Sequence, residues 1–190
     1  MKITQANQQQ ASTIAKLIML AMNHECCKNL AGTNHNLDDF EKVMNKLVEM
    51  DYSQYSHRNT LVALTDKGEI AGICVSYNGA ELHNLRKAFI EEAKNVFGID
   101  YSDIPDEATP DELYIDSLAV CEKFRCQGIA TKLLKATIKK AEDMGIKKVG
   151  LLVDKGNPKA EKLYNSIGFE YQNDDVWAGH KMKHLQVIKK

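Results

Sequence analysis

Apolar residues recur along this chain with two different spacings, and the alternation of these spacings outlines a protein of mixed helices and strands. Apolar positions every three or four residues predict amphipathic helices at residues 11 to about 27, 37 or 38 to 50, 81–97, 127–144 and 158–167. Short apolar runs predict strands at residues 2–6, 59–65, 69–77, 113–120, 146–153, 170–172 and 181–188, with a loop over residues 173–179. Helices interspersed with strands in this way are typical of an α/β or α+β fold.

The connection between the predicted strands 69–77 and 113–120 is long and divides into a helix and an acidic stretch. The helical pattern ends at Gly98, which is a candidate C-cap. Residues 100–112 then carry six acidic side chains together with Pro105 and Pro110. Two interpretations of this stretch stay open: a solvated loop, or a mobile acidic lid that attracts a cationic amine.

Composition excludes several classes of protein. A chain of 190 residues is expected to form one domain with a sizeable core. The formal net charge of −1 offers no overall attraction to nucleic acid or to an anionic membrane, and no apolar run approaches the length of a membrane span. Five cysteines without paired spacing favour a reduced, cytoplasmic protein. The run from His24 to Cys27 lacks a second ligand pair at zinc spacing, so no metal is expected.

Residues 112–169 contain the strongest functional pattern. An apolar strand ends in the turn Arg125-Cys126-Gln127-Gly128-Ile129-Ala130, which passes directly into a strongly periodic helix. The first amides of a helix lack intrahelical acceptors and carry the positive end of the helix dipole, so this geometry suits an anion. Gly128 has no Cβ and therefore lets a phosphate approach the main chain closely.

This stretch resembles the acetyl-CoA signature of the GNAT superfamily of N-acetyltransferases. Arg125, Gly128 and Ala130 stand in the pattern Q/R-x-x-G-x-G/A, and a second family block follows as Asn157-Pro158-Lys159-Ala160, Leu163-Tyr164 and Gly168-Phe169. The first block alone would be weak, but two blocks in order, separated by a helix and a strand, are specific. The resemblance is close over about a third of the chain.

The resemblance implies both a fold and an activity. The expected fold is a mixed, mostly antiparallel central sheet with helices on both faces and a splayed central strand pair. It would comprise a strand and two-helix arm (1–58), a hairpin (59–78), a helical and acidic insertion (81–111), an acetyl-CoA-binding core (112–169) and a C-terminal hairpin (170–190). The implied reaction moves the acetyl group of acetyl-CoA to a primary amine of a small molecule or peptide, by direct attack, in a monomer or homodimer. The alternative is a domain that binds acyl-CoA without catalysis, as a sensor or interaction module.

Candidate site residues follow from the family positions and from the residues themselves. Asp116 interrupts an apolar strand, where a carboxylate is costly unless it is paired or faces a cleft. It is the candidate base, with Glu112 or Tyr114 as substitutes, while a purely structural role for it stays open. Tyr164 is the implied proton donor to the leaving thiolate. The resemblance implies cofactor contacts from Leu118, Ala119, Val120, Arg125, Cys126, Gln127, Gly128, Ile129, Ala130, Thr131, Asn157 and Tyr164.

Several local expectations accompany these assignments. Asn157 precedes Pro158 and is a good helix N-cap with or without a ligand. Strict alternation would place residues 112, 114, 116, 118 and 120 on one face, unless the bulge that the family has here resets the count. Cys126 stands where the family often has glycine, and we expect its φ to be negative because a positive φ would strain a cysteine. Trp177 is either a lid over the acceptor or a packing anchor.

Overall fold

The computed structural model describes residues 1–177 and 179–189. Its strands are β1 (Lys2–Gln5), β2 (Thr60–Leu64), β3 (Ile70–Asn78), β4 (Glu112–Val120), β5 (Lys148–Asp154), β6 (Glu170–Trp177) and β7 (His180–Ile188). Its helices are α1 (Ala11–Met22), α2 (His24–Ala31), α3 (Leu37–Glu49), α4 (Leu82–Phe97), α5 (Ile129–Asp143) and α6 (Pro158–Asn165). Short 3₁₀ helices lie at Gln8–Gln10, His57–Asn59, Gly79–Glu81 and Glu122–Phe124.

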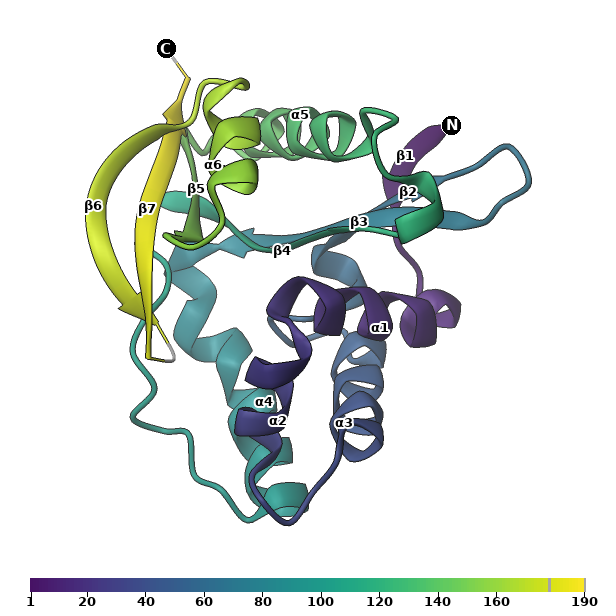
Figure 1. Cartoon of the computed structure of the whole chain (residues 1–190), viewed down its shortest axis with the longest axis vertical. Helices are drawn as coiled ribbons and strands as arrows, with labels where there is room; N and C mark the ends of the chain where they lie inside the picture. The colour runs from purple at the N-terminus through teal and green to yellow at the C-terminus, as the bar shows by residue number, and fades with distance from the viewer. Residues whose placement is uncertain (178, 190) are drawn as a thin grey trace.

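The strands form one seven-stranded sheet in the order β1-β2-β3-β4-β5-β7-β6. Every neighbouring pair is antiparallel except β4 and β5, which run parallel. Figure 1 shows α5 and α6 on one face of the sheet and α1 to α4 on the other. The expected fold class, a mixed and mostly antiparallel sheet with helices on both faces, is confirmed. Among the described residues, none of the helices combines the length and the apolar character needed to cross a bilayer.

Each face of the sheet has its own hydrophobic core. The first core joins α1, α2, α3 and α4 to the sheet, and its fully buried side chains include Ile14, Phe40 and Ile73. The second lies under α5 and includes Leu113 and Leu133. The sheet is therefore covered on both sides, which explains why its central strands are apolar throughout rather than alternating.

The N-terminal arm contains three helices, so the prediction of a single helix over residues 11–27 was wrong. Helix α1 ends before Asn23, whose φ is 66°, and a new helix begins at His24. Asparagine tolerates a positive φ better than most residues, and its side-chain oxygen accepts a hydrogen bond from the Cys26 amide at 2.9 Å. The apolar period continues across the break, so the pattern alone did not reveal it.

A β-bulge sits in β4 at Asp116. Ser117 pairs with Val75 and Ile115 pairs with Ser76, which leaves Asp116 without a partner on β3. Ile115 and Leu118 both pack in the core under α5, whereas Ala119 packs in the core under α1. The bulge therefore resets the alternation, as the family resemblance implied, and residue 118 shares a face with residue 115 and not with residue 114. The ammonium of Lys140 on α5 donates to the Ser76 carbonyl at 3.0 Å, which satisfies a backbone group at this irregularity.

The C-terminal hairpin is longer than the sequence indicated. Residues 173–177 belong to β6, whose pairing with β7 continues to Trp177 and His180, so the loop predicted over 173–179 was wrong in its described part. Most side chains of β6 are exposed because it is the edge strand of the sheet. An edge strand exposed in this way needs no apolar alternation, and the backbone pairing with β7 holds it in place.

Candidate active site

A gap opens between the two central parallel strands. Their pairing ends where Ile115 meets Leu151, although β4 continues to Val120 and β5 to Asp154. Beyond that point β5 stays paired with β7 as far as Asp154 and Met182. The two strands therefore part at the bulge, which is the splayed pair that the sequence resemblance implied. Backbone groups of β4 that would have joined the ladder face this gap.

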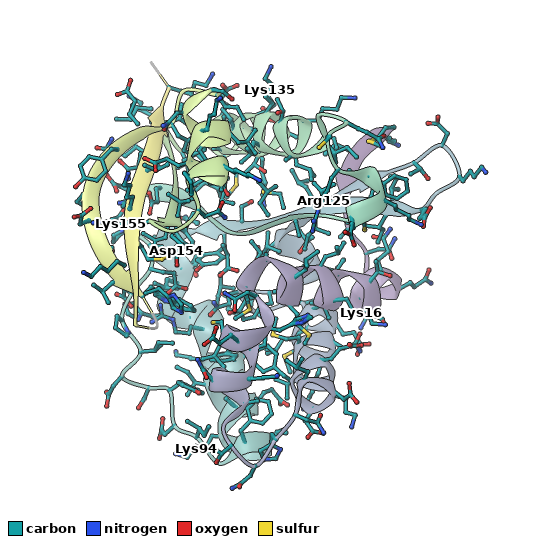
Figure 2. The ribbon with its side chains drawn as sticks, viewed as in Figure 1. Lys16, Lys94, Arg125, Lys135, Asp154 and Lys155 are labelled. Atoms are coloured by element: carbon teal, nitrogen blue, oxygen red, sulfur yellow. The ribbon has the colours of Figure 1, made fainter. Side chains whose placement is uncertain are left out.

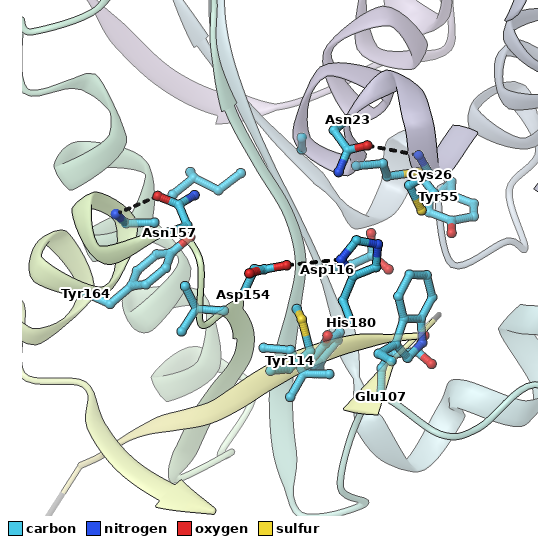
Figure 3. Close-up of a pocket in the computed structure, with 18 residues that line it drawn as sticks. Asn23, Cys26, Tyr55, Glu107, Tyr114, Asp116, Asp154, Asn157, Tyr164 and His180 are labelled. Carbon is cyan, nitrogen blue, oxygen red and sulfur yellow. Dashed lines mark hydrogen bonds and ion pairs between the residues drawn. The ribbon is translucent and has the colours of Figure 1, made fainter. Parts of the chain in front are cut away.

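A cavity of about 270 Å³ lies at the gap, bounded by the turn between α1 and α2, the ends of β4 and β5, α6 and the tip of the β6–β7 hairpin. Figure 3 shows the labelled side chains around it. Asp116, Leu118, Asn157 and Tyr164 all line this cavity, so the fold brings these four predicted site residues together. The described lining contains three carboxylates and one histidine but neither lysine nor arginine: Glu107, Asp116, Asp154 and His180.

Asp116 is held at the bulge with its carboxylate partly satisfied. The Ser117 hydroxyl donates to one oxygen at 2.7 Å, and the Gln54 amide approaches the other at 3.5 Å. Burial, and then the neighbouring Glu107 carboxylate, raise the pKa of Asp116 to about 7, against the lowering effect of the Ser117 and Gln54 hydrogen bonds. A carboxyl group with this pKa is suited to take a proton at neutral pH.

Glu107 reaches the cavity from the acidic stretch before β4. It is 6% exposed, forms an ion pair with the buried Arg86 of α4, and accepts a hydrogen bond from the Tyr77 hydroxyl at 2.8 Å. Arg86 also donates to the Ile104 and Pro105 carbonyls at 3.1 and 3.2 Å. The acidic stretch therefore divides: Asp100, Asp103, Asp106 and Asp111 are exposed, as in the solvated-loop interpretation, while its buried acids are held by specific partners.

Glu112 has a structural role and is not placed to act as a base. It is fully buried and receives hydrogen bonds from the Thr109 amide at 2.9 Å, the Gln186 amide at 2.7 Å and the His184 imidazole at 3.0 Å. Burial on its own would raise the pKa of Glu112, but these donors hold it below its usual value. A carboxylate stabilised in this way is a poor proton acceptor. Glu112 is therefore not a suitable alternative to Asp116 as the candidate base.

Gly150 on β5 leaves the space that Glu112 fills. A Cβ at this position would lie 1.6 Å from a Glu112 carboxylate oxygen and 2.9 Å from the His184 ring. We expect Gly150→Ala to lower the free energy of unfolding by about 3 kcal/mol, because the hydrogen-bonded carboxylate has no room to move. Thermal unfolding would show this as a fall in Tm of roughly 6–12 °C for a chain of this size.

Gly156→Ala is the control for this prediction. Its Cβ would lie 2.9 Å from one oxygen of the Asp154 carboxylate, which is half-exposed and has room to turn away. The Tm of this variant should stay close to that of the wild type. A Gly150→Ala protein with an unchanged Tm would contradict the tight packing around Glu112.

Tyr164 and Asn157 enter the cavity from α6. Asn157 is the N-cap of this helix, and its side-chain oxygen accepts from the Ala160 amide at 3.2 Å. Tyr164 packs edge-on against Phe169, with ring centroids 5.9 Å apart. Burial raises the pKa of the Tyr164 phenol well above its ordinary value, so the hydroxyl keeps its proton at neutral pH. The structure confirms Asn157 as an N-cap and places both side chains at the cavity.

The loop between β4 and α5 has the shape of an anion-binding turn, with one difference from the expectation. Cys126 has φ 61° and Gly128 has φ 72°, so the prediction of a negative φ at Cys126 was wrong. The thiol is exposed, and the left-handed conformation costs a residue with a Cβ about 1–2 kcal/mol. Arg125 donates to the Val120 carbonyl at 3.3 Å, which fixes the loop to the end of β4. Figure 2 shows Arg125 beside this loop, below α5.

The loop and the cavity occupy different parts of the gap. Of the residues assigned to cofactor binding, none of the described residues 125–131 lines the cavity, whereas Leu118 on β4 does. Ala119 and Val120 lie on the same strand between the two, at the end that leads to Cys121. Strand β4 therefore connects a site that suits an anion to a cavity lined by carboxylates.

Sequence reasoning missed several residues of the cavity. Tyr55 follows α3, Glu107 follows α4, and Asp154 pairs with His180 across the ends of β5 and β7 at 3.3 Å. These residues belong to no motif, and only the folded chain places them together. The excess of acids in residues 100–112 was the one available signal, although it did not single out Glu107. Trp177 packs against the core under α1, as a packing anchor would, and it also lines the cavity.

Comparisons with known proteins agree with this geometry. The sequence profile of the Acetyltransferase (GNAT) family matches residues 31–169. The ribosomal protein bS18-alanine N-acetyltransferase of Haemophilus ducreyi is 30% identical over 127 residues, which cover 67% of this chain and 81% of that protein. A solved acetyltransferase structure matches with a TM-score of 0.83 and 27% identity over 100% of both chains. An N-acetyltransferase from Staphylococcus aureus Mu50 matches with a TM-score of 0.81 and 26% identity over 98% of this chain and 100% of that one.

The family match covers well over half of the chain and includes both blocks that the sequence resemblance was based on. The family model and the curated relative are both acetyltransferases, and the splayed strands, the turn before α5 and the cavity are compatible with that activity. An enzyme is therefore the correct interpretation, in preference to a sensor without catalysis. The chain belongs to the GNAT family and is an acetyl-CoA-dependent N-acetyltransferase.

Proposed function

We propose that this enzyme acetylates a cationic primary amine, using Asp116 as the proton acceptor and Tyr164 as the proton donor. The observation that carries the proposal is the cavity itself, which both side chains line at the gap between β4 and β5. Its described lining holds Glu107, Asp116 and Asp154 without a lysine or arginine. Such a surface attracts an alkylammonium ion, which is the form in which amines reach the enzyme at neutral pH.

The proposed acetyl-CoA site is the turn before α5 together with the open edge of β4. Cys126 and Gly128 turn the chain with positive φ, and the first amides of α5, at Ile129, Ala130 and Thr131, have no acceptor within the helix. These groups suit a diphosphate, so the residues present fit the cosubstrate. Asn157 would contact it from the opposite wall. When bound there, acetyl-CoA supplies the activated acyl group.

The backbone of β4 supports the proposed oxyanion site. The Cys121 amide donates to Ala71 on β3 at 2.9 Å, and the amides of a strand point alternately to its two sides. The amides of Leu118 and Val120 therefore point away from β3, towards the gap. Fixed N–H donors at this edge would stabilise the negative charge that develops on the acyl oxygen during transfer.

The proton transfers balance with these residues. Asp116 takes one proton from the bound ammonium and passes it to solvent, which frees the nitrogen lone pair. The nitrogen then forms the new bond to the acyl carbon as the carbon–sulfur bond breaks, and Asp116 takes its second proton and releases that one to solvent as well. Tyr164 donates its phenolic proton to the departing thiolate and is returned to the neutral form from solvent. Both side chains line the same cavity, so neither transfer needs a large movement of the chain.

A peptide N-terminus is the second candidate acceptor. The relative from Haemophilus ducreyi carries the name of a ribosomal protein alanine N-acetyltransferase, and it shares 30% identity with this chain. An α-amino group is also a cation that the carboxylate lining would attract. A panel containing an alkyl diamine, an amino sugar and a peptide that begins with alanine separates these acceptors.

Two further properties stay predictions. The protein is expected to be a monomer or a homodimer, and it is expected to be cytoplasmic.

The experiment measures binding and turnover in two steps. Calorimetry with the purified protein should show uptake of acetyl-CoA, and a thiol reagent should then detect release of free CoA with at least one amine of the panel. Binding without release for every amine would contradict the acceptor assignment. The absence of binding to acetyl-CoA and to CoA would contradict the cofactor site.

Cys126 provides a direct test of the proposed cofactor loop. The thiol is exposed, and it lies two residues before the glycine that begins α5. We expect saturating acetyl-CoA to slow the reaction of Cys126 with a maleimide about tenfold or more, because a bound diphosphate would cover the turn. Mass spectrometry of the labelled peptides gives the rate at each cysteine. Equal labelling of Cys126 with and without acetyl-CoA would contradict the loop assignment.

A further inference from the structure

A second buried carboxylate lies beside Asp116, and it has a partner of its own. Glu107 is 6% exposed and Arg86 is 4% exposed, and the two form an ion pair beneath the cavity. A guanidinium stays charged at every pH at which the protein is folded, so Glu107 faces a fixed positive charge. The Tyr77 hydroxyl adds a hydrogen bond to Glu107 at 2.8 Å. This arrangement places a second carboxylate, held by two specific partners, next to the proposed base.

Gln54 connects the two carboxylates. Its side-chain nitrogen lies 3.5 Å from an oxygen of Glu107 and 3.5 Å from an oxygen of Asp116. A primary amide has two N–H donors and can serve both oxygens, and its own oxygen would be repelled if it faced them. Gln54 is 3% exposed, and its backbone amide donates to the Leu85 carbonyl of α4 at 3.3 Å. The pair is therefore held at a defined separation by α4 and by the segment that follows α3.

We propose that Glu107 is a positioning residue which, paired with Arg86 and linked through Gln54, keeps Asp116 a proton acceptor matched to neutral pH. The inference deepens the proposed function and rests on Asp116 being the base. Without a neighbouring negative charge, a carboxylate that accepts hydrogen bonds from Ser117 and Gln54 would be a weaker base. With it, the ionised form of Asp116 is destabilised and takes up a proton more readily.

The other groups around Asp116 do not replace Glu107 in this role. Burial raises the pKa of each neighbouring phenol and thiol, so these groups stay neutral at working pH: Tyr55, Tyr77, Tyr114 and Cys74. Across the cavity, Asp154 is paired with His180 at 3.3 Å. Arg86 acts in the opposite direction to Glu107 on Asp116, and its effect is the smaller of the two. Of the two charged groups that act on Asp116, Glu107 therefore has the larger effect.

The test is a direct titration of Asp116. Carbon-13 NMR of the side-chain carboxyl, assigned with Asp116→Asn, gives the midpoint in the free protein without any need for activity. We expect Glu107→Gln to move this midpoint to lower pH, because the substitution removes the charge and keeps the shape. The acid limb of the kcat/KM profile should move in the same direction, and kcat/KM at pH 7.5 should fall roughly 3–10-fold because a weaker base transfers protons less efficiently.

Two further variants make the result decisive. The control is Asp106→Asn, because Asp106 also contacts Arg86, at 3.0 Å, but is half-exposed and does not line the cavity. Asp106→Asn should leave the titration midpoint of Asp116 unchanged. Should Glu107→Gln fail to fold because Arg86 loses its partner, the double variant Arg86→Gln/Glu107→Gln removes both charges together. Its midpoint should fall below that of the wild type and above that of Glu107→Gln.

The outcomes separate this inference from the proposed function. A midpoint that stays the same or rises in Glu107→Gln and in the double variant would overturn the role of Glu107. A purely structural role would lower the stability without moving the midpoint downwards, and would overturn it equally. A midpoint that falls while the acid limb of the rate profile stays in place would support the link between the carboxylates and overturn Asp116 as the base.

Discussion

Replacing Tyr164 with phenylalanine should lower kcat by about 10²–10⁴-fold while leaving the affinity for acetyl-CoA nearly unchanged. The substitution removes only the hydroxyl and keeps the edge-on packing against Phe169. Burial raises the pKa of this phenol, so in the wild type the group is protonated and ready to donate at every pH used for the assay. A thiolate that leaves without a proton donor is the poorer leaving group, and the chemical step slows.

Single-turnover kinetics is the appropriate measurement, because product release can hide a slower chemical step in steady-state rates. Calorimetric titration with acetyl-CoA gives the affinity of the same variant. Tyr171→Phe is the matched control, since Tyr171 is 54% exposed on the edge strand β6 and lies away from the cavity. Unchanged single-turnover rates in Tyr164→Phe would remove this residue from the mechanism.

Asp116→Asn should lower kcat/KM by about 10²–10⁴-fold and should also make the folded protein more stable above pH 7. Asparagine keeps the hydrogen bond from Ser117 but has no proton affinity in this range. The loss of rate should be largest for amines that arrive fully protonated, because these depend most on a base. The acid limb of the kcat/KM profile near pH 7 should disappear in the variant.

The stability effect follows from the raised pKa of Asp116. Its value is about 7 in the folded protein against 3.8 for the ordinary carboxyl group, mainly because of burial and then because of Glu107. Between these two values the folded state binds more protons than the unfolded state, so stability falls as the pH rises from about 4 to about 7. Asp116→Asn has no carboxyl group to ionise, so its stability does not fall in this way. At pH 8 its free energy of unfolding should exceed that of the wild type by about 2–4 kcal/mol.

Denaturant unfolding at pH 5 and pH 8 measures this difference, which should be smaller at the lower pH. Asp103→Asn is the control, because Asp103 is exposed on the acidic stretch and does not line the cavity. It should match the wild type in rate and in stability at both values. An Asp116→Asn protein that retains its activity would show that the carboxylate is not the base. One that gains no stability at pH 8 would show that the carboxylate is not a costly buried charge.

The two predictions describe a conflict between stability and function at one residue. An apolar or amide side chain at position 116 would suit the buried strand better than the carboxylate does. The fold tolerates Asp116 because the bulge turns it into the cavity and because Ser117 and Gln54 donate to it. Groups that are kept at a cost to stability in this way are frequently the ones that carry activity.

The amino-acid sequence by itself determined the fold class and the family, and it located two segments of the proposed site. Apolar periodicity located most helices and strands because burial of one face imposes the spacing locally. Residues 125–130 and residues 157–164 located the proposed cofactor turn and the helix that carries Tyr164, because each motif lies within one short segment. These features depend on neighbours in the chain, so a single sequence was enough to find them.

Only the tertiary structure decided which acids act together. Glu107, Gln54 and Arg86 come from three separate segments, and nothing in their spacing predicts that they enclose Asp116. The break at Asn23, the positive φ of Cys126 and the extension of β6 also depend on contacts or backbone pairing beyond the local pattern. The proton affinity of Asp116 is set by burial and by a charge distant in the chain, and neither exists until the sheet and the helices have assembled.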